Sequence, residues 1–509
     1  MFQKVMSAGL WGIDGFLVSV EADIHDGLPG FAMTGNLSQE TKEAQERVRV
    51  ALKNGELSLP PKKITVNLSP ADVRKDGTAY DLAVAAAVLG ASGLIQAEEL
   101  KGAMLIGELG LDGRVKPVRG VLSLVCAARE GKLTRCFLPR ENALEGSMVE
   151  GVEIVPVESL KELVAILRGE QGAKRLEQDP LLFFKEQEKP YEVDFSELNG
   201  QPLLRRATEV AVAGRHNILY IGPAGAGKTM AAKRIPTIMP LMSREESIRT
   251  SKIYSVCGLL PADAPLLTRR PFRSPHHTIT ATALAGGGTV PKPGEISLAS
   301  GGVLFLDELP EFSGKAIEIL RQPLEDRAVT VSRLYGSYTF PADTMVAAAM
   351  NPCPCGFYPD RRRCTCTSWQ IKRYIGKISR PILDRIDITV EASPVTFADS
   401  RGQGANESSA KIRERVHKVQ QLQRERFAGK GILSNGEMRA KEIEQYCRLK
   451  GPEEAYLEQV YQKMELSVRG CHKILKVART IADLDGKEEI GQSHLYEAVG
   501  YRSLEEKYW

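Results

Sequence analysis

The spacing of apolar residues separates the chain into sheet-forming and helical parts. Near the N-terminus, Phe16–Ala22 and Lys63–Leu68 alternate apolar and polar positions and are rich in β-branched residues, which predicts strands. Tyr80–Leu89 is an alanine-rich apolar run, which predicts a buried helix. Weaker signals of the same kinds predict further elements at Met104–Leu109, Val121–Glu130 and Cys136–Pro139.

The pattern then changes along the chain and predicts four parts. Residues 1–168 form an α/β domain, and the charged residues 169–195, which have few periodic apolar signals, form a linker. Residues 196–395 contain short runs that are apolar at almost every position, as strands of a parallel sheet are. Residues 396–509 begin with the glycine-rich loop Ser400–Asn406 and are helical afterwards.

Length and composition narrow the class of protein. A chain of 509 residues is too long for one hydrophobic core, and 43% hydrophobic with 26% charged residues is typical of globular domains. No run of eighteen apolar residues predicts a membrane span, and the N-terminal residues lack the features of a signal peptide. We therefore expect a cytoplasmic protein without membrane contact. The net charge of +4 is too small to indicate a nucleic-acid partner by itself.

The strongest chemical signal is the glycine-rich octapeptide GPAGAGKT. The apolar strand Asn217–Ile221 leads directly into it, and a helix is expected from Thr229 onward, which is the setting of a phosphate-binding loop. The backbone N–H groups of such a loop surround phosphates, Lys228 reaches the β- and γ-oxygens, and the Thr229 hydroxyl binds Mg²⁺. The predicted nucleotide-binding residues are Gly222, Pro223, Ala224, Gly225, Ala226, Gly227, Lys228 and Thr229.

A second motif supplies the acidic groups of the same site. Gly302–Leu306 reads as a buried strand, and it ends in Asp307 and Glu308. A carboxylate such as Asp307 suits the water shell of Mg²⁺, and Glu308 suits activation of the attacking water. A chance glycine turn followed by an ordinary strand would not place both motifs in this order. The sequence therefore predicts an enzyme that hydrolyses ATP with Mg²⁺.

Two further polar residues are candidates on weaker grounds. The apolar strand Met345–Met350 ends in Asn351, whose amide could orient the lytic water, although from this residue alone a turn-forming Asn is the favoured interpretation. Arg385 could reach the nucleotide of a neighbouring subunit as an arginine finger. It could also form an ion pair with Asp384 or Asp387, and the residues alone leave both readings open.

Four of the nine cysteines form a compact motif. They make two C-x-C pairs separated by eight residues, and four thiolates on two tight turns could close a tetrahedral zinc site. Free thiols or disulfides are the alternatives. Because the motif has no carboxylate or histidine, we expect a structural ion and no catalysis there. The predicted zinc ligands are Cys353, Cys355, Cys364 and Cys366.

Two segments have the composition of a nucleic-acid surface. Asp360–Arg385 carries eight Lys or Arg against two Asp, with Trp369 and Tyr374 among them. A subunit interface that senses ATP is the alternative. Val329–Phe340 alternates about a Tyr-Gly-Ser turn and predicts a β-hairpin.

The pair His276-His277 is expected to make a loop contact or a satisfied polar pair, since a metal site is less favoured.

In this order, the motifs resemble the magnesium-chelatase-like branch of the AAA+ ATPases, and nearly the whole chain resembles its bacterial ComM/YifB family. The resemblance implies a P-loop domain with a parallel sheet, a helical lid and a homo-hexamer with ATP between subunits. It implies a motor for single-stranded, forked or branched DNA that acts in branch migration and DNA uptake. A chelatase-like subunit and a protein-remodelling chaperone are the rival interpretations. The strings that carry the resemblance are RSPHHT, PGEISLA, LFLDELPEF, NPCPCG and VARTIADL.

The same resemblance implies roles for single residues. Asn351 takes the sensor-1 position, Arg385 the arginine-finger position and Arg469 the sensor-2 position, where a displaced lid could direct it to the neighbour's nucleotide. Arg380 is a weaker candidate for a second trans-acting arginine. In the relatives a hairpin like Val329–Phe340 points into the hexamer pore, which would bring Arg333 and Tyr335 near a DNA strand.

The N-terminal domain resembles the catalytic domain of Lon-type proteases, which uses a Ser-Lys dyad. The motif Lys75–Gly77 matches the residues before the protease serine, but Ala79 stands at the serine position. Gly113–Val115 matches the second motif, and Leu122 stands at the dyad lysine. Since neither nucleophile nor base remains, we expect no peptidase activity. The resemblance implies an oligomerisation and DNA-contact domain instead.

Overall fold

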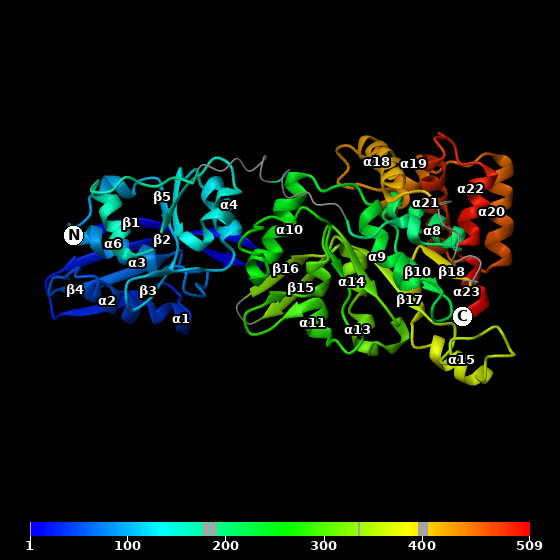
Figure 1. Cartoon of the computed structure of the whole chain (residues 1–509), viewed down its shortest axis with the longest axis horizontal. Coiled ribbons are helices and arrows are strands. Elements are labelled where there is room, and N and C mark those ends of the chain that lie inside the picture. The colour runs from blue at the N-terminus through cyan, green and yellow to red at the C-terminus, as the bar shows by residue number, and fades with distance from the viewer. Residues whose placement is uncertain (1, 177–183, 185–190, 334–335, 395–405) are drawn as a thin grey trace.

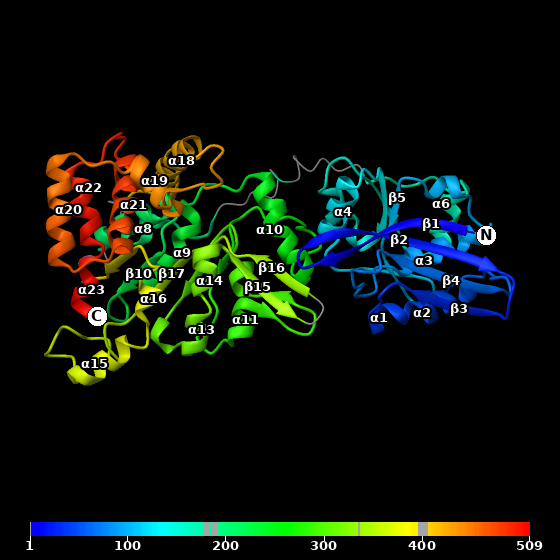
Figure 2. The same ribbon diagram turned by 180° about the vertical axis from the view of Figure 1, so that it is seen from behind.

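The computed structural model describes residues 2–176, 184, 191–333, 336–394 and 406–509. Three regions follow one another along the long axis of the molecule, an N-terminal α/β unit, a central P-loop unit and a C-terminal helical unit (Figures 1 and 2). The predicted loop Ser400–Asn406, apart from its last residue, and much of the predicted linker lie outside the described residues. No helix among the described residues is long and apolar enough to cross a membrane.

The N-terminal unit is built on a seven-stranded mixed sheet in the order β3-β4-β2-β1-β5-β8-β9. The predicted strands lie within β2 and β4, and the predicted alanine-rich helix is α3, whose residues are all buried. β1 was not predicted, although it pairs with β2 over its whole length. The strands are β1 Phe2–Trp11, β2 Asp14–His25, β3 Gly30–Thr34, β4 Lys63–Ser69, β5 Ala103–Leu105, β6 Glu108–Leu109, β7 Val115–Lys116, β8 Arg135–Pro139 and β9 Glu153–Val157, and the helices are α1 Gln39–Lys42, α2 Ala44–Asn54, α3 Asp81–Ala91, α4 Val121–Glu130, α5 Ala143–Ser147 and α6 Leu160–Leu167.

The central unit contains the predicted parallel sheet, in the order β11-β14-β17-β10-β18. Its three inner strands are buried at every position, which explains their uninterrupted apolar runs. Because all the strands run the same way, their carboxyl ends meet at one edge of the sheet. The strands are β10 Ile218–Ile221, β11 Phe272–Arg273, β12 Gly286–Gly287, β13 Lys292–Pro293, β14 Val303–Leu306, β15 Ala328–Arg333, β16 Gly336–Pro341, β17 Met345–Met350 and β18 Ile388–Glu391.

Helices cover the central sheet and then form the C-terminal unit. The lid helices α18 and α21 pack on α8, so one hydrophobic core joins the lid to one face of the sheet. The helices are α8 Pro202–Gly214, α9 Lys228–Ile238, α10 Arg244–Cys257, α11 Ala281–Ala285, α12 Glu295–Leu298, α13 Gly314–Glu318, α14 Arg321–Asp326, α15 Ser368–Ile375, α16 Arg380–Leu383, α18 Ser409–Arg426, α19 Ala440–Tyr446, α20 Gly451–Lys463, α21 Val468–Leu484, α22 Gln492–Gly500 and α23 Ser503–Tyr508.

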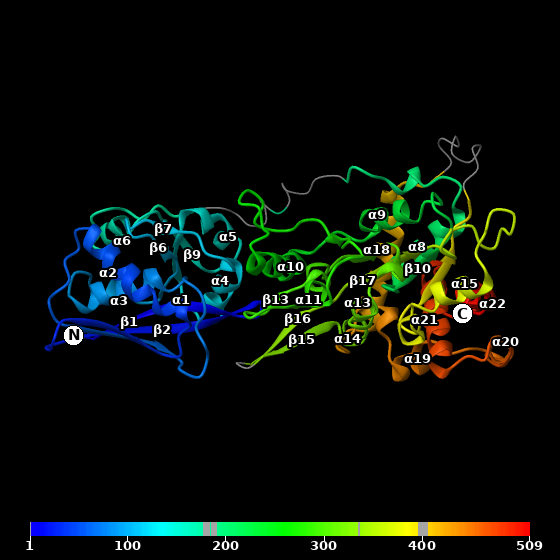
Figure 3. The same cartoon turned by 90° about the horizontal axis from the view of Figure 1, so that it is seen from below.

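The tip of the β1–β2 hairpin joins the N-terminal unit to the central one (Figure 3). Trp11 stacks on Tyr338 of β16 with ring centroids 4.5 Å apart, and Ile13 belongs to a hydrophobic core of the central unit. Gly336 lies against the indole of Trp11, where a Cβ would come within 2.6 Å of a ring carbon. The two units therefore share a packed contact in addition to their covalent link.

Candidate functional site

The phosphate-binding loop connects β10 to α9, as the sequence predicts. Gly225 and Gly227 have φ angles of +79° and +83°, a backbone region that favours glycine over residues with a Cβ. A cavity of about 460 Å³ opens at this loop and is also lined by residues that follow β14 and β17. The structure thus brings together three motifs that are far apart in the sequence. The lining residues are Ala224, Gly225, Ala226, Gly227, Lys228, Thr229, Met230, Asp307, Glu308, Met350 and Asn351.

Lys228 lies within the loop with its ammonium group fully engaged. Its Nζ donates to the carbonyl oxygens of Gly222 at 2.6 Å and Pro223 at 2.8 Å, and to Oδ1 of Asn351 at 3.2 Å. Burial lowers the pKa of Lys228 to about 8. A phosphate oxygen would replace these neutral acceptors with a charged one, which favours the ammonium form.

The two predicted Mg²⁺ ligands touch each other. Thr229 Oγ1 donates to Oδ2 of Asp307 at 2.8 Å, across the start of α9 and the end of β14. A hydroxyl and a carboxylate oxygen are the hard ligands that Mg²⁺ prefers, and Mg²⁺ keeps several waters beside such a pair. These residues therefore fit the ion predicted for them.

Glu308 has an unusual backbone and an unexpected partner. Its φ is +53°, a left-handed conformation that costs a non-glycine residue on the order of 1 kcal/mol or more and that clusters at functional sites. His277 Nδ1 lies 3.4 Å from Oε2 of Glu308, and the ring of His276 lies 4.1 Å from that of His277. The expected loop contact of the His pair is thus a contact with the predicted catalytic carboxylate. Sequence reasoning missed it because no spacing rule links the two segments.

Arg385 and Arg469 do not line the phosphate-loop cavity. Both line a second cavity of about 500 Å³, between the central sheet and the lid. Arg385 pairs with Glu325 at 2.7 Å and donates to the carbonyl oxygen of Pro381 at 2.6 Å. The ion-pair alternative considered for Arg385 therefore has a different partner from Asp384 or Asp387. Further cationic residues of this arginine pocket are Arg215, Arg327, Arg439, Lys473 and Lys476.

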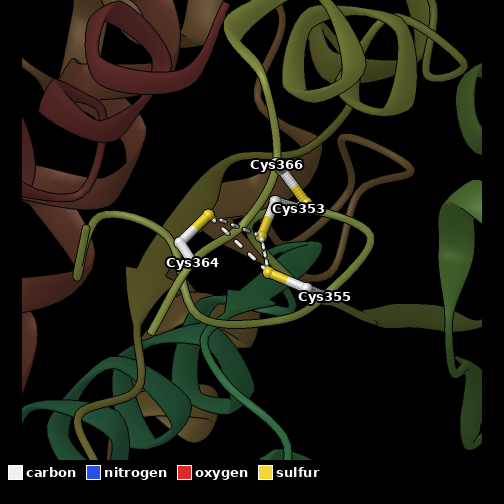
Figure 4. A group of neighbouring side chains, drawn as sticks. All are labelled: Cys353, Cys355, Cys364 and Cys366. Atoms are coloured by element: carbon white, nitrogen blue, oxygen red, sulfur yellow. Dashed lines mark hydrogen bonds between the residues drawn. The ribbon is translucent and has the colours of Figure 1, made fainter. Parts of the chain in front are cut away.

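The four predicted zinc ligands gather at one point (Figure 4). Their sulfur atoms all lie within 4.8 Å of one another, and three of the separations are 3.4, 3.6 and 3.8 Å. Tetrahedral zinc with Zn–S bonds of about 2.3 Å requires sulfurs about 3.8 Å apart. All four cysteines are free thiols. A backbone N–H at Phe357 lowers the pKa of Cys355 to about 6, so this thiol ionises readily. The donor set fits zinc.

The cysteine cluster adjoins the phosphate-loop cavity. Cys353 is two residues beyond Asn351 in the chain. A Cβ added to Gly356, where φ is +81°, would lie 3.9 Å from both the Ala224 nitrogen and the Asn351 side chain, which is van der Waals distance. The loop that carries the cysteines therefore lies beside the phosphate-binding loop and the predicted sensor residue.

The predicted hairpin Val329–Phe340 is confirmed, since β15 pairs antiparallel with β16. Arg333 ends β15, and its Nε donates to the carbonyl oxygen of Gly288 at 3.1 Å. Tyr335 lies outside the described residues. The hairpin is covered on one side by Trp11 of the N-terminal unit.

The protease-like cleft of the N-terminal unit has no dyad. Ala79 lines a cavity of about 490 Å³ that is also lined by Val256 and Tyr338 of the central unit. Leu122, at the lysine position, is fully buried, and Lys75 donates to backbone carbonyl oxygens, including that of Val73 at 2.9 Å. The structure thus places apolar side chains where the protease would need a nucleophile and a base.

Comparison with known proteins gives matches along the whole chain. Residues 20–142 match the family described as subunit ChlI of Mg-chelatase, residues 194–400 match magnesium chelatase, subunit ChlI, and residues 406–502 match its C-terminal family. Competence protein ComM of Haemophilus influenzae is 41% identical, with 98% of this chain and 97% of that protein covered. The uncharacterized protein YifB of Escherichia coli is 38% identical, with 97% and 96% covered.

A partial match concerns the N-terminal unit. Lon protease of Dictyoglomus thermophilum is 31% identical over 29% of this chain, which is 19% of the protease. This supports the Lon-like character of the N-terminal sheet, beside the P-loop and helical units that match the chelatase families. With full-length identity of 38 to 41% to ComM and YifB, the chain belongs to the ComM/YifB family of magnesium-chelatase-like proteins.

Proposed function

We propose that this protein is a homo-hexameric, ATP-hydrolysing DNA motor of the AAA+ type, active in branch migration during homologous recombination and DNA uptake. The observation that carries the proposal is the division of the predicted ATP site between two cavities. The phosphate-loop cavity holds the lysine and the carboxylates, and the arginine pocket holds Arg385 and Arg469. An ATP site divided in this way is complete only where two subunits meet.

Within one subunit, the phosphate-loop cavity supplies binding and water activation. The loop amides and Lys228 would hold the β- and γ-phosphates, and Thr229 and Asp307 would hold Mg²⁺, which would neutralise phosphate charge. Glu308 accepts a proton from the attacking water, and its 57% exposed side chain is open to that water. Asn351 orients the same water from the end of β17, fixed by its contact with Lys228.

The neighbouring subunit supplies the positive charge that the transition state needs. Arg385 acts as the finger after exchanging Glu325 for the γ-phosphate, and Arg469 assists from the lid. We assign Arg469 to the neighbour's nucleotide because it shares a cavity with Arg385 and is absent from the lining of its own phosphate-loop cavity. This arrangement makes hydrolysis depend on assembly.

DNA is proposed as the substrate on two grounds. The relative with 41% identity is a competence protein, and DNA uptake is what competence denotes. The β15–β16 hairpin, with Arg333 at the end of β15, is the segment we assign to a DNA strand in the pore, together with Tyr335, which lies two residues later in the sequence. The moving strand would then be pulled when successive subunits hydrolyse ATP. Single-stranded, forked and branched DNA are the expected ligands.

The remaining parts have supporting roles in this proposal. Residues 1–168 form the oligomerisation and DNA-contact domain without peptidase activity, residues 169–195 the linker, 196–395 the ATPase core and 396–509 the lid. Structural zinc occupies the four cysteines. The protein works in the cytoplasm.

A chelatase-like subunit that uses ATP for metal insertion is the second candidate, because the matching families are described as magnesium chelatase. ATPase assays separate the candidates. Stimulation by forked or single-stranded DNA, with a hexamer mass in the presence of ATP, supports the motor. Indifference to DNA combined with stimulation by a porphyrin-chelatase partner, or by unfolded protein, would overturn it.

A further inference from the structure

The segment from Cys353 to Lys377, here called the knuckle, contains the cysteine cluster and α15. It projects from the central unit near the C-terminus, and both views of the molecule show α15 well away from the β15–β16 hairpin (Figures 1 and 3). The knuckle is therefore a different surface from the one assigned to the pore. Its exposed aromatic and cationic side chains indicate what kind of ligand it could bind.

The most exposed aromatic side chain of the knuckle is that of Trp369. The Trp369 side chain, in the first turn of α15, is 66% exposed, and the Arg373 guanidinium lies 5.1 Å from its ring centre. A second guanidinium, that of Arg363, lies 4.1 Å from the ring of Phe357, which is also exposed. Two exposed rings of this segment thus each have a guanidinium beside them, an arrangement that suits stacking on a planar, negatively charged ligand.

The charge around the tryptophan is strongly positive and largely unneutralised. Between Cys353 and Lys377 there are six Lys or Arg and one Asp, and all six cations are exposed. Among the residues that the structure describes, Lys377 pairs with Glu311, but the other five have no carboxylate within ion-pair distance. These five are Arg361, Arg362, Arg363, Lys372 and Arg373.

We propose that the knuckle is a binding site for single-stranded nucleic acid, in which a base stacks on Trp369 and the surrounding cations hold the phosphates. This inference rests on the proposed DNA motor and adds a second DNA contact outside the pore hairpin. Indole stacking requires an unstacked base, which a single strand offers and a duplex does not. A subunit interface, where Trp and Arg are also enriched, would need several carboxylates of the neighbouring subunit to pair the five cations, whereas a nucleic-acid strand supplies a phosphate at every nucleotide.

The knuckle also has a short route to the nucleotide. Gly356 lies against the phosphate-binding loop and Asn351, and the knuckle chain continues from there through the cysteines to α15. A strand held at Trp369 would therefore restrain the segment next to the predicted sensor residue. We expect binding at the knuckle to contribute to stimulation of the ATPase by DNA.

The test uses the full-length protein and a fluorescent oligothymidylate strand, with affinity measured by anisotropy at two salt concentrations. Trp369→Ala should weaken binding about tenfold, because stacking is worth roughly 1–3 kcal/mol per base, and Trp369→Phe should retain most of it. Arg362→Ser combined with Lys372→Ser should lower the salt slope by about 1.4. Tyr461→Ala removes an exposed aromatic side chain from α20, outside the knuckle, and should leave binding unchanged.

Basal ATPase without DNA should be the same in Trp369→Ala and wild type, while its stimulation by the strand should fall. If wild type binds the strand and Trp369→Ala binds it equally well, the knuckle proposal is wrong and the motor stands. If Trp369→Ala lowers the mass of the assembly and leaves DNA affinity intact, the knuckle is a subunit interface and the proposal is likewise overturned. If wild type binds no DNA of any form, the proposed function fails as well.

Discussion

The phosphate-loop cavity and the arginine pocket are both charged hollows of similar volume, about 460 and 500 Å³, yet they are built in opposite ways. The first collects groups at the carboxyl ends of parallel strands, where loop amides and a carboxylate pair suit phosphate and Mg²⁺. The second collects cations from the ends of α8 and α14, from the turn after α16 and from the lid, with Arg385 held by Glu325. The first is lined by one lysine and two carboxylates, whereas the second is lined by seven Lys or Arg and three carboxylates.

This difference shows how a subunit can be fully folded and still contain only part of the proposed ATP site. Three cations of the arginine pocket, Arg215, Arg327 and Arg385, form ion pairs with carboxylates of the same chain. Lys473 and Lys476 donate to backbone carbonyl oxygens. Arg385 must give up one such carboxylate to serve a phosphate, which makes its catalytic form depend on a neighbour. The following experiments test whether the two cavities are halves of one site.

The largest effect is expected for Arg385→Ala. Loss of an arginine finger should lower kcat for ATP by about 10³–10⁵, with ATP affinity nearly unchanged. Mixing this variant with Lys228→Ala should restore part of the ATPase activity. At a mixed interface, the Arg385→Ala subunit supplies Lys228 and the Lys228→Ala subunit supplies Arg385. Arg321→Ala, which removes an exposed arginine that pairs with Glu318 and does not line the pocket, is the matched control. Unchanged turnover in Arg385→Ala would show that the pocket is not part of the site.

A smaller loss is expected for Glu308→Gln. Removing the base should lower kcat by about 10²–10⁴ while the neutral amide leaves phosphate binding and DNA binding intact. ATP should remain trapped on the protein, which filter binding with labelled ATP measures. Because this residue belongs to the phosphate-loop cavity, mixing with Arg385→Ala should restore some activity. A variant that no longer binds nucleotide would contradict the role given to Glu308.

Removal of the metal should impair the phosphate-loop cavity and leave the arginine pocket unchanged. Cys364→Ser should abolish metal retention, measured by elemental analysis, and lower ATPase on the order of tenfold because the loop that contacts Asn351 loosens. Cys257→Ser changes a free thiol elsewhere in the central unit and is the control. Zinc absent from wild-type protein purified without chelator would end the proposal of a structural ion.

The smallest effect is a pH dependence of ATP binding. In the free protein the pKa of Lys228 is lowered to about 8, whereas bound phosphate should raise it. Below pH 8 the lysine is charged in both states, so affinity is constant, and above it the free protein must take up a proton to bind. ATP affinity should therefore fall by about fourfold from pH 7 to 8.5. Calorimetry in buffers of different ionisation enthalpy should show proton uptake, and proton release would refute the assignment.

Much of the site could be predicted because its parts are local. The glycine loop, the Asp307-Glu308 pair and Asn351 each follow an apolar strand, and a parallel sheet brings such ends to one edge whatever their separation in sequence. The four cysteines were readable for the same reason, since all lie within one loop. By contrast, β1 was missed because its residues alternate weakly and its pairing with β2 and β5 supplies most of what stabilises it.

The sequence by itself determined which chemistry the chain carries: a phosphate loop with its acidic partners, four thiols that suit one ion, and a protease-like domain without nucleophile or base. Only the tertiary structure decided which of these groups contact one another and which cavity each of them lines. Long-range packing placed His277 on Glu308, Trp11 on the β15–β16 hairpin, and Arg385 with Arg469 in one pocket away from their own nucleotide loop. Spacing along a chain encodes contacts within an element, whereas contacts between elements depend on how several faces pack at once.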